Sequence, residues 1–560
     1  MARIVHFSLI SLGLCVATAH AQDRYLNEVF TNDQIMVTPD VVYGTNINFM
    51  LSDFTSPNVP SELMQLHQWA GAGQPIAAAY YDPADESTAV KVQDVRMDIY
   101  QPDQTADTET DRPVVVYIHT GNALPPPLNG SPNGTRKDSS AVEICKRMAR
   151  RGYVAVSMSY RHGWNPIAPT LQERRGTLLN AIYRAIHDVK QCVRTLKQDA
   201  DMYNIDANKV ILFGEGTGGY IALATATLDE PQELFIEKFL PDPFNPNVSY
   251  VDTAQVGNLE GFNGMLNLYY PNGLDSDIHF SVNLGGALAD TSWLAPGDAP
   301  MVAFHTVNDP FAPFGDGIVI VPTTGEQVVD VNGSNSFMQL VNAYGNNSSF
   351  ATLPSGDMYT DIARSRYGTA ITSSAGTVNI NSNVEGLYPV ITSDWPSMGI
   401  APLHESGPWQ WWDPNSAVAQ TVVNPGPPPI TAHQASLASN PNMSPEKGRA
   451  MIDTIMGYTN PRIVCALQLG PCSLVSIEET DAIAAGVEVF PNPAHDLVSI
   501  TSTAAPILRY ELFDMHGRLV DARNVNSNRT VIERNGAGAG VYYVQLHFAK
   551  GTLTRKLIMD

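Results

Sequence analysis

The chain has 560 residues, too many for one ordinary domain, so we expect one large domain and a smaller one. Its composition, 44% hydrophobic and 16% charged, is that of a globular protein rather than of a disordered one. A formal net charge of −23 argues against nucleic acid or an anionic membrane surface as a partner, and it fits a soluble protein that works outside the cell.

The first residues have the pattern of a removable export signal. Arg3 supplies a positive charge, residues 4–16 form a short apolar stretch, and Ala19-His20-Ala21 is an A-x-A cleavage site. The apolar stretch is too short to cross a bilayer, and no later run is long and apolar enough to do so. We therefore expect cleavage after Ala21 and no transmembrane segment.

Removal of this signal would leave four cysteines, and an even number in an exported protein indicates disulfides. Cys465 and Cys472 flank a short turn-like segment and suit a local bridge. Cys145 and Cys192 lie on separate helical segments, where they either pair with each other or stay as buried thiols. No cysteine has the spacing of a zinc site, and we expect neither a metal nor a cofactor.

Residues 22–111 alternate short β-like runs with polar turns, and a β-then-α rhythm follows. The segments with the character of buried strands are 114–118, 154–157, 210–213, 280–284 and 301–305, and those with helical spacing are 141–151, 177–196 and 445–458. Alternating helices and continuously apolar strands predict a mostly parallel sheet covered on both faces. Two irregular stretches, 229–277 and 315–410, interrupt the rhythm, and the first is expected to form a cap over the sheet edge.

The segment Phe213 to Gly219 has the setting of a catalytic motif without its catalyst. Strand, glycine turn and helix are the context of the G-x-S-x-G nucleophile elbow. Here the motif reads Gly214-Glu215-Gly216-Thr217-Gly218, so glycine stands at the nucleophile position. Without a side chain at Gly216 there is no hydroxyl to deprotonate, and no covalent acyl-enzyme can form.

Residues 98–458 resemble secreted carboxylesterases of the α/β-hydrolase superfamily. Besides the elbow, the matching segments are 112–122, which stands where these enzymes carry an H-G-G-type oxyanion segment, 152–161, 185–190, and the acid-bearing strand and loop 299–310. The resemblance implies an α/β-hydrolase fold with irregular inserts that acts on small or polyester-type carboxylic esters.

The superfamily's order of nucleophile, acid and histidine assigns roles along this chain. Gly216 holds the nucleophile position and Asp309 the acid position. His404 is the preferred histidine and His433 the alternative. In such a triad the histidine takes the serine proton while the carboxylate fixes the imidazole tautomer. Because only the nucleophile is visibly absent, Gly216→Ser is expected to create activity on short acyl esters.

The resemblance also implies an oxyanion hole. Its donors would be the backbone N–H groups of Thr217 and of Gly121 or Asn122. Thr120 departs from the usual second glycine of the oxyanion segment, which weakens this transfer. Thr217 lies one residue past the apex, where the backbone N–H rather than the side chain faces the oxyanion, so its hydroxyl is not expected to replace the serine.

The chain changes character after Cys472, where short alternating strands with glycine turns predict a small β-sandwich. The pieces V-F-P-N-P, Y-E-L-F-D-M-H-G-R, G-V-Y-Y-V-Q-L and R-K-L-I resemble, in order, the type A C-terminal sorting domain of the type IX secretion system. This resemblance implies that the type IX machinery carries the protein from the periplasm across the outer membrane, with removal of the tail. An ordinary adhesive β-domain is the alternative.

The sequence thus predicts a signal peptide at 1–21, a hydrolase domain at 22–475, a linker at 476–486 and a sorting domain at 487–560. Two classes of function stay open. One is a secreted carboxylesterase-type enzyme that is inactive or weak with Gly216. The other is a non-catalytic extracellular binding protein that uses the hydrolase cleft or its inserts, as in the cholinesterase-like neuronal adhesion proteins, where glycine also replaces the serine.

Overall fold

The computed structural model describes residues 24–321, 325–353, 357–373, 376–392, 405–470, 472, 486–503, 505–514, 518–534, 538–548 and 551–559. The predicted signal peptide, His404 and nearly all of the predicted linker lie outside these residues. The described residues fall into two compact units, one within 24–351 and 367–469 and the other within 352–366 and 470–560.

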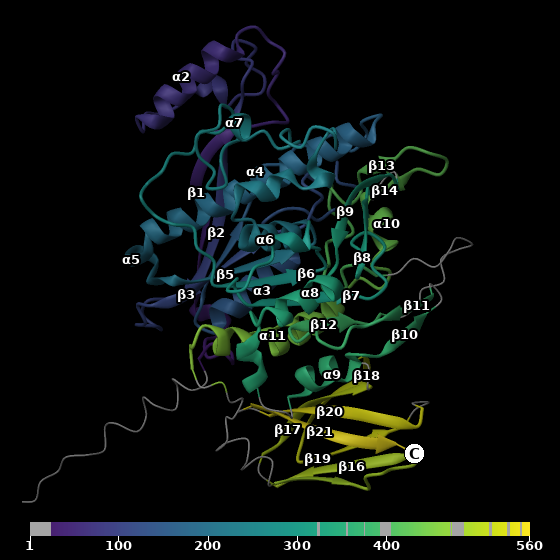
Figure 1. Cartoon of the computed structure of the whole chain (residues 1–560). Helices are drawn as coiled ribbons and strands as arrows, with labels where there is room; N and C mark the ends of the chain where they lie inside the picture. The colour runs from purple at the N-terminus through teal and green to yellow at the C-terminus, as the bar shows by residue number, and fades with distance from the viewer. Residues whose placement is uncertain are drawn as a thin grey trace, which may run out of the picture. The chain divides into compact units, whose positions relative to one another are not determined.

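An eight-stranded sheet forms the centre of the first unit (Figure 1), with the order β1-β2-β4-β3-β5-β6-β7-β12. Its strands are β1 Ile35–Ile47, β2 Val92–Pro102, β3 Arg112–Ile118, β4 Val154–Met158, β5 Ile205–Glu215, β6 Phe280–Leu284, β7 Met301–Thr306 and β12 Leu387–Val390. The β1–β2 and β2–β4 pairs are antiparallel, and the other neighbours are parallel. This sheet is that of the predicted α/β-hydrolase fold.

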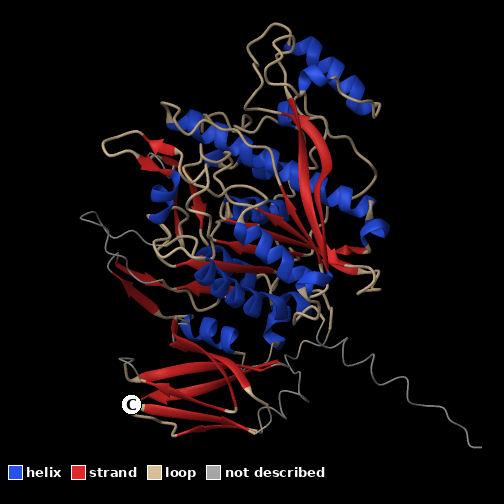
Figure 2. Ribbon diagram, turned by 180° about the vertical axis from the view of Figure 1, so that it is seen from behind, coloured by secondary structure: helices blue, strands red, loops and turns tan. Residues whose placement is uncertain are grey.

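Helices flank the sheet (Figure 2), which is why its central strands are buried along their whole length and are mostly apolar. The main helices are α3 Ser139–Arg150, α4 Leu171–Gln198, α6 Thr217–Thr227, α8 Ser334–Ala343 and α11 Pro445–Ala466. The predicted end of the last helix at residue 458 is wrong, because α11 continues through Pro461. Buried Ile463 and Val464 belong to this extension, so tertiary packing outweighs the backbone hydrogen bond that proline cannot donate.

The segment between β1 and β2 differs from the prediction, which gave only short β-like runs there. Both strands are long, and between them lies α2, Val59–Gly71, which projects beyond the strand ends (Figure 1). Leu63 and Leu66 of α2 pack with Tyr80 and Leu268 in a small hydrophobic cluster of their own. The apolar face of α2 therefore holds the helix against this cluster.

Short elements occur in the two irregular stretches and in other connections of the chain. The strands are β8 Asp316–Ile320, β9 Gln327–Asn332, β10 Ala370–Ser373, β11 Gly376–Asn379, β13 Val422–Asn424 and β14 Ile430–Thr431, and the short helices are α5 Ala200–Tyr203, α7 Thr253–Val256 and α10 Ala432–Leu437. The 3-10 turns are η1 Asn32–Gln34, η2 Ala78–Tyr80, η3 Pro231–Phe235, η4 Glu237–Phe239, η5 Thr291–Trp293 and η6 Ser348–Thr352. Most of the sequence between 229 and 277 is loop, as expected for a cap.

The second unit contains α9, Met358–Arg366, and two antiparallel sheets of order β15-β16-β19 and β18-β17-β20-β21. Their strands are β15 Val487–Phe490, β16 Leu497–Ser502, β17 Ile507–Asp514, β18 Leu519–Ser527, β19 Arg529–Glu533, β20 Gly540–Phe548 and β21 Gly551–Met559. Side chains from both sheets, including Ile500, Ile532, Tyr510 and Val544, share one hydrophobic core. This is the β-sandwich that the turn spacing predicts.

The cysteines separate into two groups. Cys465 and Cys472 are disulfide-bonded. Cys145 and Cys192 are free and buried, so the alternative in which they pair with each other is wrong. Of the helices that the structure describes, none combines the length and the hydropathy needed to cross a membrane.

Candidate functional site

Gly216 forms the apex of a sharp turn between β5 and α6. Its φ and ψ are 53° and −115°, a backbone conformation in which a side chain is strained, as at the apex of a nucleophile elbow. The N–H of Gly216 donates to Leu284 O at 2.7 Å and ties the turn to the end of β6. A Cβ on Gly218 would lie 2.0 Å from Ile118 O, so this glycine lets α6 approach β3 closely.

The space beside the apex is filled by Thr120, which follows β3. An ideal Cβ on Gly216 would lie 2.3 Å from Thr120 Oγ1 and 3.1 Å from Thr120 Cβ. A serine at position 216 therefore requires the Thr120 side chain to move, and a β-branched side chain has few rotamers to move to. The sequence marks Thr120 as unusual but does not show that its hydroxyl stands where the serine would be.

Two of the residues predicted to form an oxyanion hole, Asn122 and Thr217, are in contact, but through the Thr217 side chain. Thr217 Oγ1 accepts a hydrogen bond of 2.7 Å from the backbone N–H of Asn122. The Asn122 carbonyl, in the next peptide unit, accepts from Trp164 Nε1 at 2.6 Å, which also restrains Asn122. Gly121, with φ at 121°, completes the turn. An acyl oxygen could reach the Asn122 N–H only by displacing Thr217.

Asp309 lies in the loop after β7. Its Oδ1 accepts from the backbone N–H groups of Phe311 at 2.8 Å and Ala312 at 2.9 Å. Burial raises the pKa of Asp309 to about 7, although these bonds oppose the rise. Burial and then the charge of Asp309 raise the pKa of Tyr220, which lies one helical turn after Gly216. Asp309 is thus close enough to the elbow for its charge to act there.

We predict that Asp309→Asn stabilises the protein increasingly as the pH rises. Because the pKa of Asp309 is higher in the folded than in the unfolded protein, its protonation favours folding. This contribution is complete below the unfolded pKa and is lost as the pH rises toward about 7. The asparagine carbonyl can still accept from Phe311 and Ala312 but never carries a charge. Melting temperatures of both proteins from about pH 5 to about pH 9 should show the difference growing through about pH 7, and a constant difference contradicts the assignment.

The two candidate histidines have different outcomes. His404 lies outside the described residues, which resume at Glu405, so its role stays a prediction. His433, in α10, accepts a hydrogen bond of 3.1 Å at Nδ1 from Trp412 Nε1. A neutral His433 then carries its proton on Nε2. A triad base needs the opposite tautomer, with the proton on Nδ1 and a free Nε2.

A feature that sequence reasoning missed is the environment of Glu215. This carboxylate is fully buried beneath the elbow, where burial raises its pKa. Its Oε1 accepts from Trp409 Nε1 at 2.9 Å and from Gln410 Nε2 at 2.6 Å. Its Oε2 accepts from Ser140 Oγ at 3.1 Å and from Tyr117 Oη. Glu215 thereby anchors the segment after residue 404 to the elbow. The feature of the sequence that could have indicated this role is a charged residue within an apolar strand–helix turn.

We predict that Glu215→Leu destabilises folding by about 3 kcal/mol or more, since each buried donor left without an acceptor costs about 1–3 kcal/mol. Glu215→Gln is the matched control, because its amide oxygen keeps two donors and its NH₂ can donate to the hydroxyls of Ser140 and Tyr117. Urea unfolding should show a much smaller loss for glutamine than for leucine. Equal losses would mean that the hydrogen bonds contribute little.

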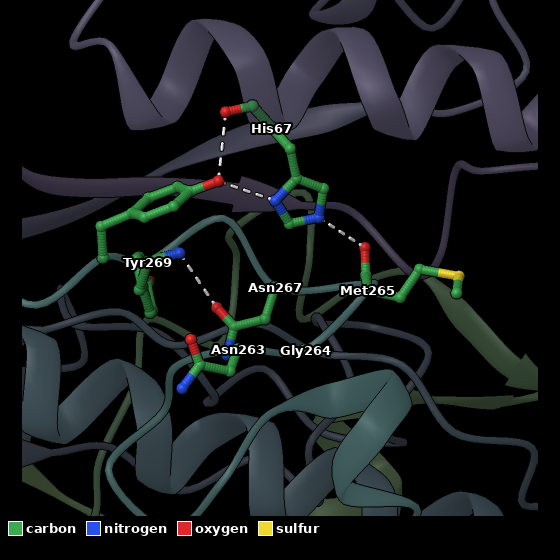
Figure 3. Close-up of a pocket in the computed structure, with 7 residues that line it drawn as sticks. His67, Asn263, Gly264, Met265, Asn267 and Tyr269 are labelled. Carbon is green, nitrogen blue, oxygen red and sulfur yellow. Dashed lines mark hydrogen bonds between the residues drawn. The ribbon is translucent and has the colours of Figure 1, made fainter.

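A hollow of about 420 Å³ lies between α2 and the 263–270 segment (Figure 3). His67 of α2 bonds through Nδ1 to Tyr270 Oη at 2.8 Å and through Nε2 to Met265 O at 2.9 Å. Both ring nitrogens are used, so His67 fastens α2 to the insert and has no free nitrogen for catalysis or a metal. Within the described part of the chain, no three His, Cys, Asp or Glu residues are grouped to hold a metal ion.

Comparison with known proteins gives two domain matches. Residues 97–316 match the BD-FAE family, and residues 488–560 match the secretion system C-terminal sorting domain. The chain therefore carries an esterase-like α/β-hydrolase domain followed by a type IX sorting domain, which directs it to the cell surface or the extracellular space. No curated protein matches the chain.

Among solved structures, esterase 2 of Thermogutta terrifontis with propionate bound is 16% identical, and the match covers 40% of this chain and 70% of that one at a TM-score of 0.26. The same esterase phosphorylated by paraoxon is 18% identical over 40% and 69%, also at 0.26. MGS-M1, an α/β hydrolase from a Medee basin deep-sea metagenome library, is 15% identical over 39% and 66% at 0.23. Likenesses at these scores carry no argument about activity.

Proposed function

We propose that this BD-FAE domain is a carboxylesterase-type α/β-hydrolase domain that does not cleave esters and that acts, once exported, by binding a ligand. The observation that carries the proposal is the apex of the elbow. Gly216 offers no oxygen, and Thr120 Oγ1 occupies the space that a side chain there would need. A serine-type ester hydrolase needs a hydroxyl at this apex to attack the acyl carbon.

The predicted oxyanion hole and triad acid also depart from what ester hydrolysis requires. Removing the nucleophile of a well-studied serine protease lowers turnover by about 10⁶. An oxyanion hole helps only when its donors are free and already aimed at the developing charge, and the Asn122 N–H is bonded to Thr217 Oγ1. Burial raises the pKa of Asp309 to about 7, so in the resting protein at neutral pH about half of the molecules lack the charge of the triad acid.

The fold around the elbow, which lacks a nucleophile, is nevertheless intact. Glu215 still fixes the segment that follows residue 404, and the sorting domain marks the whole chain for export. Export of a well-ordered domain that lacks a nucleophile supports a binding role, although a fold by itself does not determine a function.

Weak ester hydrolysis is the second candidate function. One observation favours it: among the described residues, none donates to or accepts a hydrogen bond from the Thr120 hydroxyl, which lies at the edge of the apex. A hydroxyl in this place, or a water bound near it, could attack an ester slowly.

Pre-steady-state hydrolysis of p-nitrophenyl acetate separates the two candidates. Our proposal predicts no burst of nitrophenol and a slow rate that is the same in wild type and Thr120→Val. A burst approaching one product per chain, abolished by Thr120→Val, would instead establish Thr120 as a nucleophile and overturn the binding role.

A further inference from the structure

A second hollow, of about 610 Å³, lies on the insert side of the first unit and is formed by the start of α4, the 236–250 segment, Asp290 and Asp330. This volume is in the range of small-molecule sites, about 300–1,000 Å³. Asp290 follows β6, whose carboxyl end reaches the same sheet edge as the elbow. The apolar lining residues include Ile236, Leu240, Pro241 and Pro243.

One of the two cationic side chains that line the hollow, Lys238, already makes all its hydrogen bonds within the protein. Lys238 Nζ forms an ion pair of 2.9 Å with Asp290 and donates to Asp330 O at 3.0 Å and to Ala289 O. All three donors of this ammonium group are therefore used within the protein. Lys238 and Asp290 neutralise each other and form a fixed part of the wall.

The other cation, Arg175, is held in place but left available. Its Nε donates to Val328 O at 2.8 Å, which fixes the plane of the guanidinium. None of the described residues accepts a hydrogen bond from its Nη atoms. Burial raises the pKa of Tyr250 and the charge of Arg175 opposes that rise, so the guanidinium lies near the Tyr250 ring inside the hollow.

We infer that this hollow binds a small amphiphile that carries one carboxylate. The two Nη atoms of Arg175 present the planar pair of donors that a carboxylate accepts. The apolar body of the ligand would lie on Ile236, Leu240 and the two prolines. Two exposed acids, Glu237 and Asp330, also line the hollow, and they disfavour a second negative charge on the ligand. The inference rests on the proposed function, because a binding protein with a closed elbow needs a site elsewhere.

Calorimetric titration with octanoate, suberate and 1-octanol tests this inference on the full chain. We expect octanoate to bind at least about tenfold more tightly than 1-octanol or the dicarboxylate suberate. Arg175→Gln should weaken octanoate about tenfold or more and leave 1-octanol unchanged. Arg96→Gln, on β2, is the matched control and should change neither.

Three results would overturn the inference: no binding of octanoate up to about 10 mM, equal affinity for octanoate and 1-octanol, or full affinity in Arg175→Gln. If Arg175→Gln fails to fold without its bond to Val328, Ile236→Glu gives an independent test. A carboxylate on the apolar lining should abolish octanoate binding. Neither variant touches the elbow, so the burst assay can fail or succeed independently of this site.

Discussion

Gly216→Ser alone is expected to leave the protein without measurable esterase turnover, whereas Gly216→Ser combined with Thr120→Gly and Thr217→Ala is expected to create it. From the sequence alone the single substitution would suffice. The structure changes that expectation, because the new Cβ would lie 2.3 Å from Thr120 Oγ1 and the Asn122 N–H would stay bonded to Thr217. Glycine at 120 makes room for the serine, and alanine at 217 frees the oxyanion donor.

The gain should be large, since a missing nucleophile accounts for a factor of about 10⁶ in a mature enzyme and even a poorly repaired site should recover about 10²–10⁴ of it. Turnover of p-nitrophenyl acetate by the triple variant measures the gain. Adding Asp309→Asn or His404→Ala should abolish it. Equal activity in the single and triple variants would show that Thr120 and Thr217 do not block the site, and a folded but inert triple variant would show that the catalytic constellation is lost.

Deletion of residues 487–560 should trap the protein in the periplasm of a host that has the type IX machinery. The sorting domain is the address for passage across the outer membrane, and it has its own hydrophobic core around Tyr510 and Val544. The hydrolase domain has a separate core and should keep its melting transition after the deletion. We expect nearly complete loss of the protein from the medium and the cell surface.

Immunoblots of periplasmic and extracellular fractions measure this effect. Leu508→Gln, an exposed substitution in the tail, is a control that should not alter export. Normal extracellular amounts of the truncated protein would show that the tail is not the export signal. Intact-mass analysis of the exported full-length protein should also give an N-terminus at Gln22 and a C-terminus near the predicted linker at 476–486, because an exposed polar segment is easily cleaved.

The sequence was most informative where chemistry is local. The segments that became β3, β4 and β6 could be predicted because strands buried on both faces are mostly apolar. The elbow was equally visible, since the turn between β5 and α6 needs a positive φ at Gly216, which is a local demand of the backbone. α2 was not predicted, because its apolar face packs on residues such as Leu268 that are about 200 positions away.

The closure of the site was beyond sequence reasoning for the same reason. Thr217 and Asn122 are 95 residues apart, and nothing local shows that the hydroxyl of one takes the N–H of the other. The position of the Thr120 hydroxyl beside Gly216 likewise depends on how β3 and β5 pair. Glu215 could have been suspected as a buried charge, but its partners at Trp409 and Gln410 come from nearly 200 residues later.

The most direct measurement of the central claim is intact-mass spectrometry of the protein after incubation with a fluorophosphonate. Reagents of this kind mark an activated hydroxyl, and we predict that the wild-type mass is unchanged while the triple variant gains one adduct at position 216. One adduct per wild-type chain on Thr120 or Thr217 would contradict the account, because it would show that a threonine has taken over the role of the missing serine.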